Sequence, residues 1–135
     1  MRAGPLVAAA TYYVVTVFVI GFALGTVRTL FLTPRLGPFV AVSIELPFML
    51  CASALVARAL VRRRRLNRWR DRAALGAMAF VMLMIIEASF ARLFGISLAG
   101  WFASLGTPAG LLGLAGQLGF AAMPALFQPA SRFNA

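Results

Sequence analysis

The chain has 135 residues, of which 62% are hydrophobic and only 12% are charged, about half the charged share of a soluble domain. So short a chain cannot bury so large an apolar fraction in its own core, which excludes an ordinary water-soluble globule and predicts a membrane protein. Its 13 basic residues are all arginine, and the lack of histidine excludes imidazole-based catalysis and histidine metal sites.

Long stretches with few or no charges predict four spanning helices, because a helix needs about 20 apolar residues to cross a bilayer. In chain order the expected spans are residues 9–31, 38–57, 73–94 and 107–127, within a single domain that covers 1–135. The apolar runs are continuous and do not alternate as barrel strands do. We therefore expect an all-α fold, an integral membrane four-helix bundle.

Three features of the expected spans carry more detail. The first apolar stretch is too long for a cleaved secretory signal, so we expect it to remain as an uncleaved anchor, with Tyr12 and Tyr13 in an interfacial aromatic belt. Pro47 and Pro124 each remove one helical hydrogen bond, which frees the carbonyls of Ser43 and Phe120. Residues 95–106 stay open between a loop, a short interfacial helix and a re-entrant segment.

An arginine run separates the second and third expected spans. Short loops rich in arginine remain cytoplasmic, so we expect a basic cytoplasmic loop with both termini in the cytoplasm, and an arginine-only basic complement indicates a GC-rich bacterial genome and hence a bacterial inner membrane. The run acts either as a topology determinant alone or also as a binding surface for anionic inner-leaflet lipids; nucleic acid is not an expected partner. Its members are Arg58, Arg62, Arg63, Arg64, Arg65, Arg68, Arg70 and Arg72, joined on that side by Arg2 and Arg132.

Small residues are expected to hold the helices together, because lipid gives apolar helices no other reason to associate and glycine lets two backbones approach closely. The pattern occurs as Gly21-x-x-x-Gly25 in the first span and as Gly106-x-x-x-Gly110 followed by Gly113 in the fourth.

Charged residues inside the apolar stretches form the candidate site, since charges are costly in a membrane and are functional candidates by default. At 1.5 Å per residue, Glu45 and Glu87 both lie about 10 Å below the outer surface. Arg28 and Gln117 share helix faces with the glycines, and Glu87 and Arg92, five residues apart, point in different directions. The expected charged cluster consists of Arg28, Glu45, Glu87 and Arg92, with Gln117 deeper and Arg35 as an outer lid.

Three chemical interpretations of the charged cluster are open. The first is a set of ion pairs that fix helix register. The second is an outward-opening pocket in which arginines hold an anionic ligand or lipid headgroup. The third is a proton-coupled path through a desolvated glutamate.

At the level of function, the sequence predicts a protein that acts by binding. Our first hypothesis is an accessory or scaffold subunit of a membrane complex or homo-oligomer, and the alternative is a small transporter or an anion- or lipid-binding membrane protein that uses the charged cluster. No nucleophile with an activating base is visible, so we expect neither enzyme activity nor a cofactor or metal. A lipid-modifying enzyme would have to use Ser43, Ser53 or Ser89 beside the glutamates.

Overall fold

The computed structural model describes residues 2–129, and these form helices joined by short turns, with no strand among them. Four of the helical segments are long and apolar enough to cross a membrane, in agreement with the expected spans. The chain is therefore all-helical and has the construction of a multi-pass membrane protein. Arg132 lies outside the described residues.

The first spanning segment is longer than the expected 9–31. It runs from Ala3 to Leu36 as three consecutive pieces, α1 (Ala3–Val27), a five-residue π-helical turn η1 (Arg28–Leu32) and a single turn α2 (Thr33–Leu36). It ends at Gly37, whose φ of 81° lies in the left-handed region that glycine adopts without strain. Pro38 follows as the first residue of the next helix, a position where proline needs no N–H.

The arginine run is mostly helical, which corrects the expected loop. Helix α3 (Pro38–Arg64) continues through the first arginines and α4 (Trp69–Leu93) begins four residues earlier than expected, so the connection consists only of residues 65–68. Arg65 adopts a left-handed conformation (φ 51°), and the Leu66 N–H donates to the Val61 carbonyl to close the end of α3. Leu66 is buried, so the turn is fastened to the core.

Residues 95–106, left open by the sequence, contain a short helix, α5 (Leu98–Leu105), before α6 (Pro108–Leu126). Each of these helices begins at a hydroxyl cap. Ser97 Oγ accepts from the Gly100 N–H at 3.0 Å, and Thr107 Oγ1 accepts from the Gly110 N–H at 3.1 Å. These caps allow two separate helices within a stretch that has no charge to interrupt it.

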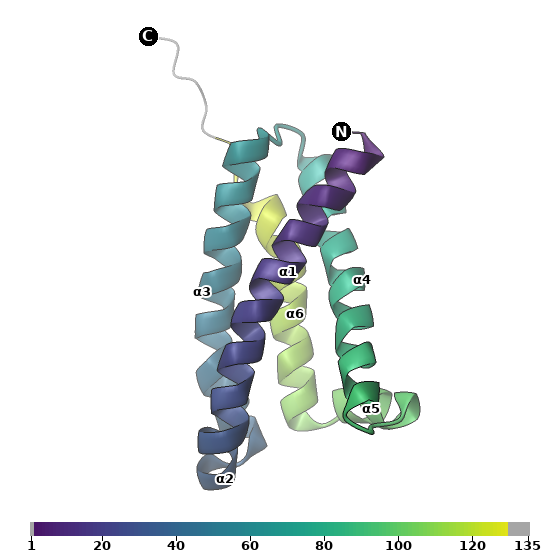
Figure 1. Ribbon diagram of the computed structural model, residues 1–135. Coiled ribbons are helices and arrows are strands. Elements are labelled where there is room, and N and C mark those ends of the chain that lie inside the picture. The colour runs from purple at the N-terminus through teal and green to yellow at the C-terminus, as the bar shows by residue number, and fades with distance from the viewer. Residues whose placement is uncertain (1, 130–135) are drawn as a thin grey trace.

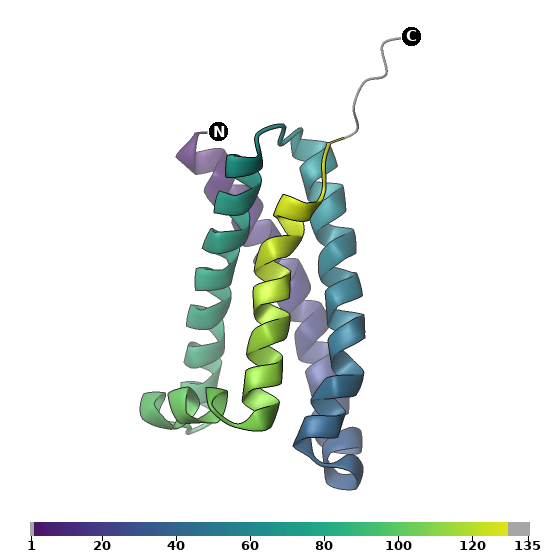
Figure 2. The ribbon, with the colours of Figure 1, turned by 180° about the vertical axis from the view of Figure 1, so that it is seen from behind.

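The four long segments form a bundle in which α1 and α6 lie on opposite sides and each packs against both α3 and α4 (Figures 1 and 2). The N-terminal end of α1, the α3–α4 turn and the C-terminal end of α6 gather at one end of the bundle, which we call the arginine end. The turn of α2 and helix α5 lie at the other, the hairpin end.

The buried apolar core lies mainly toward the arginine end. Its members come from all four long helices and include Tyr13, Val14, Val61, Leu75 and Ala79, each no more than 1% exposed. Tyr13 is completely buried, so the expectation that it belongs to an interfacial belt is wrong, whereas Tyr12 is 53% exposed.

The buried Tyr13 compensates for a hydrogen bond that Pro124 removes from α6. Pro124 has no N–H to donate to the carbonyl four residues before it, that of Phe120, and the Tyr13 hydroxyl donates to this carbonyl at 2.7 Å. The Tyr13 and Phe120 rings are also stacked, with centroids 4.4 Å apart. One side chain of α1 thereby satisfies the backbone group that a proline leaves free in α6.

Replacing Tyr13 by phenylalanine is expected to lower the free energy of unfolding by about 1–2 kcal/mol, because the Phe120 carbonyl then lies in an apolar core without a donor. The measurement is denaturation in mixed detergent micelles. Tyr12→Phe removes the same hydroxyl from the exposed neighbour and is the matched control, with an expected change near zero. Equal effects of the two variants would contradict the assignment.

The glycines differ in what they contact. A side chain at Gly21 would meet Met49 of α3, one at Gly25 would meet only Arg28 and Glu45, and a Cβ at Gly113 would stand in open space. Gly106 ends α5 and lies outside α6, whereas Gly110 lies against the Ser104 and Leu105 backbone at the end of α5, so of these two glycines only Gly110 makes a close helix contact. Gly76 of α4 makes an equally close contact, against the Ala121 backbone of α6.

Candidate functional site

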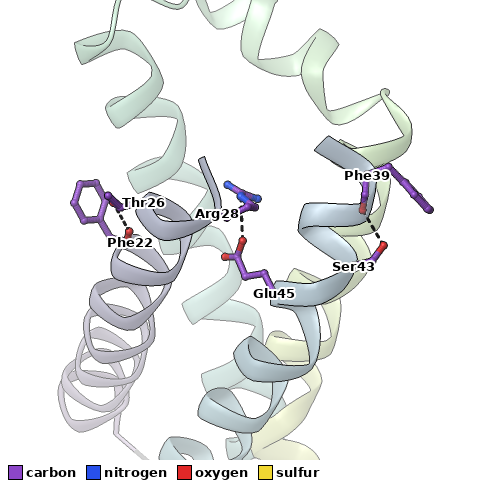
Figure 3. Close-up of polar contacts among 6 residues, drawn as sticks. All are labelled: Phe22, Thr26, Arg28, Phe39, Ser43 and Glu45. Carbon is purple, nitrogen blue, oxygen red and sulfur yellow. Dashed lines mark hydrogen bonds and ion pairs between the residues drawn. The ribbon is translucent and has the colours of Figure 1, made fainter. Parts of the chain in front are cut away.

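Arg28 and Glu45 form an ion pair between the first spanning segment and α3, with Arg28 Nε 3.0 Å from Glu45 Oε2 (Figure 3). Their side chains are 31% and 13% exposed. The contact lacks hydrogen-bond geometry, and Glu45 Oε2 is buried without a hydrogen-bond donor. The neighbouring hydroxyls of Thr26 and Ser43 donate to carbonyls of their own helices, so they do not compete for either charge (Figure 3).

The backbone around Arg28 departs from the regular α-helix. The π-helical turn begins at Arg28. The Arg28 carbonyl accepts from the N–H of Thr33, five residues later. π-Helical turns of this kind are rare and often occur at functional sites, because the extra residue changes the direction of nearby side chains. Nothing in the amino-acid sequence predicted this turn.

Glu87 and Gln117 form the second contact of the charged cluster, between α4 and α6. Gln117 Nε2 donates to both carboxylate oxygens of Glu87, at 2.7 Å and 2.6 Å. Gln117 therefore lies at the level of Glu87, not deeper as expected. Its own carbonyl oxygen is buried without a donor.

Arg92 and Arg35 do not join these contacts, contrary to the expected cluster. Both side chains are exposed, Arg92 in the last turn of α4 and Arg35 in α2, and neither forms an ion pair with a described residue. The charged cluster is therefore smaller than expected, with Arg28 as its cation and Glu45, Glu87 and Gln117 as its other members.

A cavity of about 160 Å³ lies among the four long helices next to this cluster. We call it the deep cavity. Arg28, Glu45 and Gln117 line it together with apolar groups such as Val17 and Phe120. Phe120 also belongs to the stacked Tyr13–Phe120 pair of the buried core. The deep cavity thus combines apolar walls with a small number of polar groups, which is typical of small-molecule sites.

A second cavity, of about 400 Å³, adjoins the first at the hairpin end. This end cavity shares Arg28, Val42, Gly113 and Gln117 with the deep cavity and adds Glu87. Its other lining includes the exposed residues Thr29, Ser104 and Thr107 and the half-buried Trp101 of α5. The two cavities therefore reach from the surface at the hairpin end toward the middle of the bundle.

The charges around the two cavities do not balance. Arg28 is matched by Glu45, whereas Glu87 has a neutral amide as its partner and no cation paired with it among the described residues. The orphaned oxygens of Glu45 and Gln117 add two further acceptors without donors. Such a site favours a ligand that brings positive charge or hydrogen-bond donors.

The serines considered for chemistry are engaged with their own helices. The hydroxyls of Ser43, Ser53 and Ser89 donate to the carbonyls four residues earlier, at 2.7–2.8 Å. Ser53 is buried and lines the deep cavity, while Cys51, two residues away, is exposed on the outside of α3.

The arginines of the run lie at the opposite end of the bundle and take no part in the two cavities. All are exposed except Arg72, which is only 6% exposed and donates from Nη1 to the carbonyls of Leu66 and Asn67. Arg72 is therefore a structural part of the α3–α4 turn, which its position in a charged run did not reveal.

Sequence reasoning also missed Trp101 and Gly113 as cavity residues. Gly113 was expected only as a packing residue, yet it lines the end cavity together with Trp101. The short caps at Ser97 and Thr107 were the available signal for a folded segment that brings Trp101 over the end of α6.

Comparison with protein-family models, with curated proteins and with solved structures finds no match to this chain.

Proposed function

We propose that this protein is a ligand-binding membrane protein, a small transporter or binding protein, whose deep and end cavities take an amphipathic molecule with a cationic head. The observation that carries the proposal is Glu87, a carboxylate on the cavity wall that is hydrogen-bonded to the neutral Gln117 amide and forms no ion pair with any described residue. Because an uncompensated charge is costly in a membrane, a cationic group is the natural complement. Trp101 beside Glu87's cavity adds an aromatic ring, a group that attracts quaternary ammonium ions.

The proposal includes an orientation and a membrane. In a bacterial inner membrane, the arginine end lies in the cytoplasm by the positive-inside bias, and the cavities then open on the outer side. The packed core around Tyr13 and Phe120 separates them from the cytoplasmic side. A carrier exposes its binding site to one side of the membrane at a time, and cavities that open only on the outer side meet this requirement. Single cysteines introduced at Asn67 and Gly106 in a Cys51→Ser background, labelled with a membrane-impermeant reagent in intact cells, test this orientation. We expect labelling at Gly106 and none at Asn67.

The test of the cavity uses benzyltrimethylammonium, titrated by calorimetry against the purified protein in detergent. Neopentylbenzene has the same shape with carbon in place of the charged nitrogen and serves as the uncharged control. We expect measurable binding of the cation and at least tenfold weaker binding of the isostere. Equal affinities, or no binding of the cation by folded protein, would contradict the proposal.

Filling the two cavities with an added side chain is expected to weaken ligand binding. Gly113→Leu places a side chain where a Cβ meets no atom within 4 Å, in the wall common to both cavities, so it occupies ligand space without moving backbone. We expect at least tenfold weaker binding of benzyltrimethylammonium. Ala115→Leu adds a side chain to the exposed face of α6 and is the matched control, with unchanged binding. Equal loss of binding in both variants would mean that the added side chain does not act by filling the cavities.

A second candidate is an accessory or scaffold subunit of a membrane complex or homo-oligomer. It is supported by α3 and α6. In the most apolar stretch of each helix only 11% of the residues are buried within the single chain, so both helices offer wide faces to another membrane helix. Native mass spectrometry in mild detergent tests it. A strictly monomeric protein that brings no partner from the membrane would exclude this candidate while leaving the ligand-binding proposal in place.

A further inference from the structure

A groove of about 650 Å³ lies at the arginine end, beside the α3–α4 turn and residues 128–129. We call it the arginine groove. Arg68, Arg70 and Arg72 line it together with Trp69, and none of the three arginines forms an ion pair with a described residue. Asp71, in the first turn of α4, has an interaction of its own and is not among the lining residues. The arginine groove therefore concentrates positive charge.

Arg72 shows that this charge is built into the fold and is not only a solvated run. Only 6% of Arg72 is exposed, so the residue is more than nine-tenths buried. Nη1 donates to the Leu66 carbonyl at 2.9 Å and to the Asn67 carbonyl at 3.2 Å, while the buried Nε has no acceptor. A guanidinium that is this buried, and that has only neutral partners, is stabilised by an anion next to it.

The start of α4 contributes a second feature that favours an anion. The cap residue, Arg68, supplies no side-chain hydrogen bond. Its carbonyl accepts from the Asp71 and Arg72 N–H groups, so the Trp69 and Arg70 N–H groups are the ones at the start of this 25-residue helix that lack a helical partner. Such N–H groups, together with the positive end of the helix dipole, bind phosphate groups in many proteins. The same stretch of chain carries the three arginines that line the groove.

We infer that the arginine groove binds a phosphate group, supplied by an anionic phospholipid of the adjoining leaflet. Arginine matches phosphate because its planar guanidinium offers two parallel N–H donors. Trp69, in the same groove, is 64% exposed, and indole rings favour the interface between headgroups and acyl chains. This site lies at the opposite end of the bundle from the two cavities and is independent of the ligand proposed for them.

The test is titration of the full-length protein in detergent with dioctanoyl-phosphatidylglycerol, followed by native mass spectrometry. The variant Arg68→Gln/Arg70→Gln removes two charges from the groove and leaves Arg72, which holds the turn. We expect about tenfold weaker lipid binding, or more. Arg62→Gln/Arg63→Gln removes the same charge from the exposed end of α3, outside the groove, and is expected to change binding less than twofold. Melting temperatures of both variants verify that they are folded.

Two further arms identify the ligand chemistry. Dioctanoylglycerol has the same acyl chains without the phosphate and is expected not to bind in the groove, and inorganic phosphate is expected to compete only weakly. Inorganic phosphate that binds as tightly as the lipid would assign the groove to free phosphate and overturn the lipid as its source. Equal losses in the two double variants, or binding of dioctanoylglycerol as tight as that of the phospholipid, would overturn the site.

Discussion

Replacing Glu87 by glutamine is expected to weaken the binding of benzyltrimethylammonium about a hundredfold, because removing one partner of a desolvated charge pair typically costs 2–5 kcal/mol. Binding of the uncharged neopentylbenzene is expected to remain unchanged. The substitution keeps the shape of the side chain and removes only its charge, so the calorimetric titration separates charge recognition from the fit of the cavity.

The same variant is expected to retain its stability. Gln117 Nε2 can still donate to the new amide oxygen at position 87, and the new amide nitrogen can donate to Gln117 Oε1, which has no donor in the wild-type protein. A purely structural Glu87 would behave differently, since its loss would lower stability together with binding.

Asp71→Asn is the matched control, because it removes one negative charge at the arginine end, far from the cavities. We expect it to leave the affinity for the cation within twofold. A comparable loss in this control would show that overall charge, and not Glu87, determines binding.

Replacing Arg28 by methionine is expected to lower the free energy of unfolding by roughly 3 kcal/mol. Breaking a buried ion pair typically costs 3–5 kcal/mol, and the lower end applies because the Arg28 side chain is 31% exposed. The unpaired Glu45 carboxylate, 13% exposed, causes most of this cost. Glu45→Leu is expected to cost less, since the longer arginine side chain can extend its charge toward the surface.

The double variant Arg28→Met/Glu45→Leu is the decisive measurement. Because it leaves no unpaired charge, we expect it to recover most of the stability that Arg28→Met loses, and the double-mutant cycle gives the coupling energy directly. Unfolding is followed in mixed detergent micelles. Additive losses in the two single variants would mean that Arg28 and Glu45 do not interact energetically.

These two experiments also separate the interpretations left open by the sequence. Arg28–Glu45 is an ion pair between the first spanning segment and α3, the kind of contact on which the register interpretation depends. Glu87–Gln117 is not an ion pair, and it lies on a cavity wall. The anionic-ligand interpretation is weakened, because the only arginine of the cluster already has a carboxylate beside it. The charged cluster thus contains one ion pair and one candidate binding group.

Helix ends show where sequence reasoning was limited. The expected span 107–127 is close to the observed Pro108–Leu126, because Thr107 and Pro108 are local signals for a helix start. The expected end of the second span at residue 57 was wrong, because charge was taken as the end of a helix. Arginine is a good helix former, so α3 continues past the apolar stretch to Arg64.

The amino-acid sequence by itself determined the class of this protein, the number of its spanning helices and which residues are the costly charges. These properties follow from hydrophobicity and length, which act locally along the chain. Only the tertiary structure decided that Gln117 joins Glu87, that Tyr13 serves the Phe120 carbonyl, and that Arg92 stays outside the cluster. Such pairings depend on the rotation and register of helices that are distant in sequence. In lipid these are set by side-chain packing and interhelical hydrogen bonds, which periodicity along one helix does not reveal.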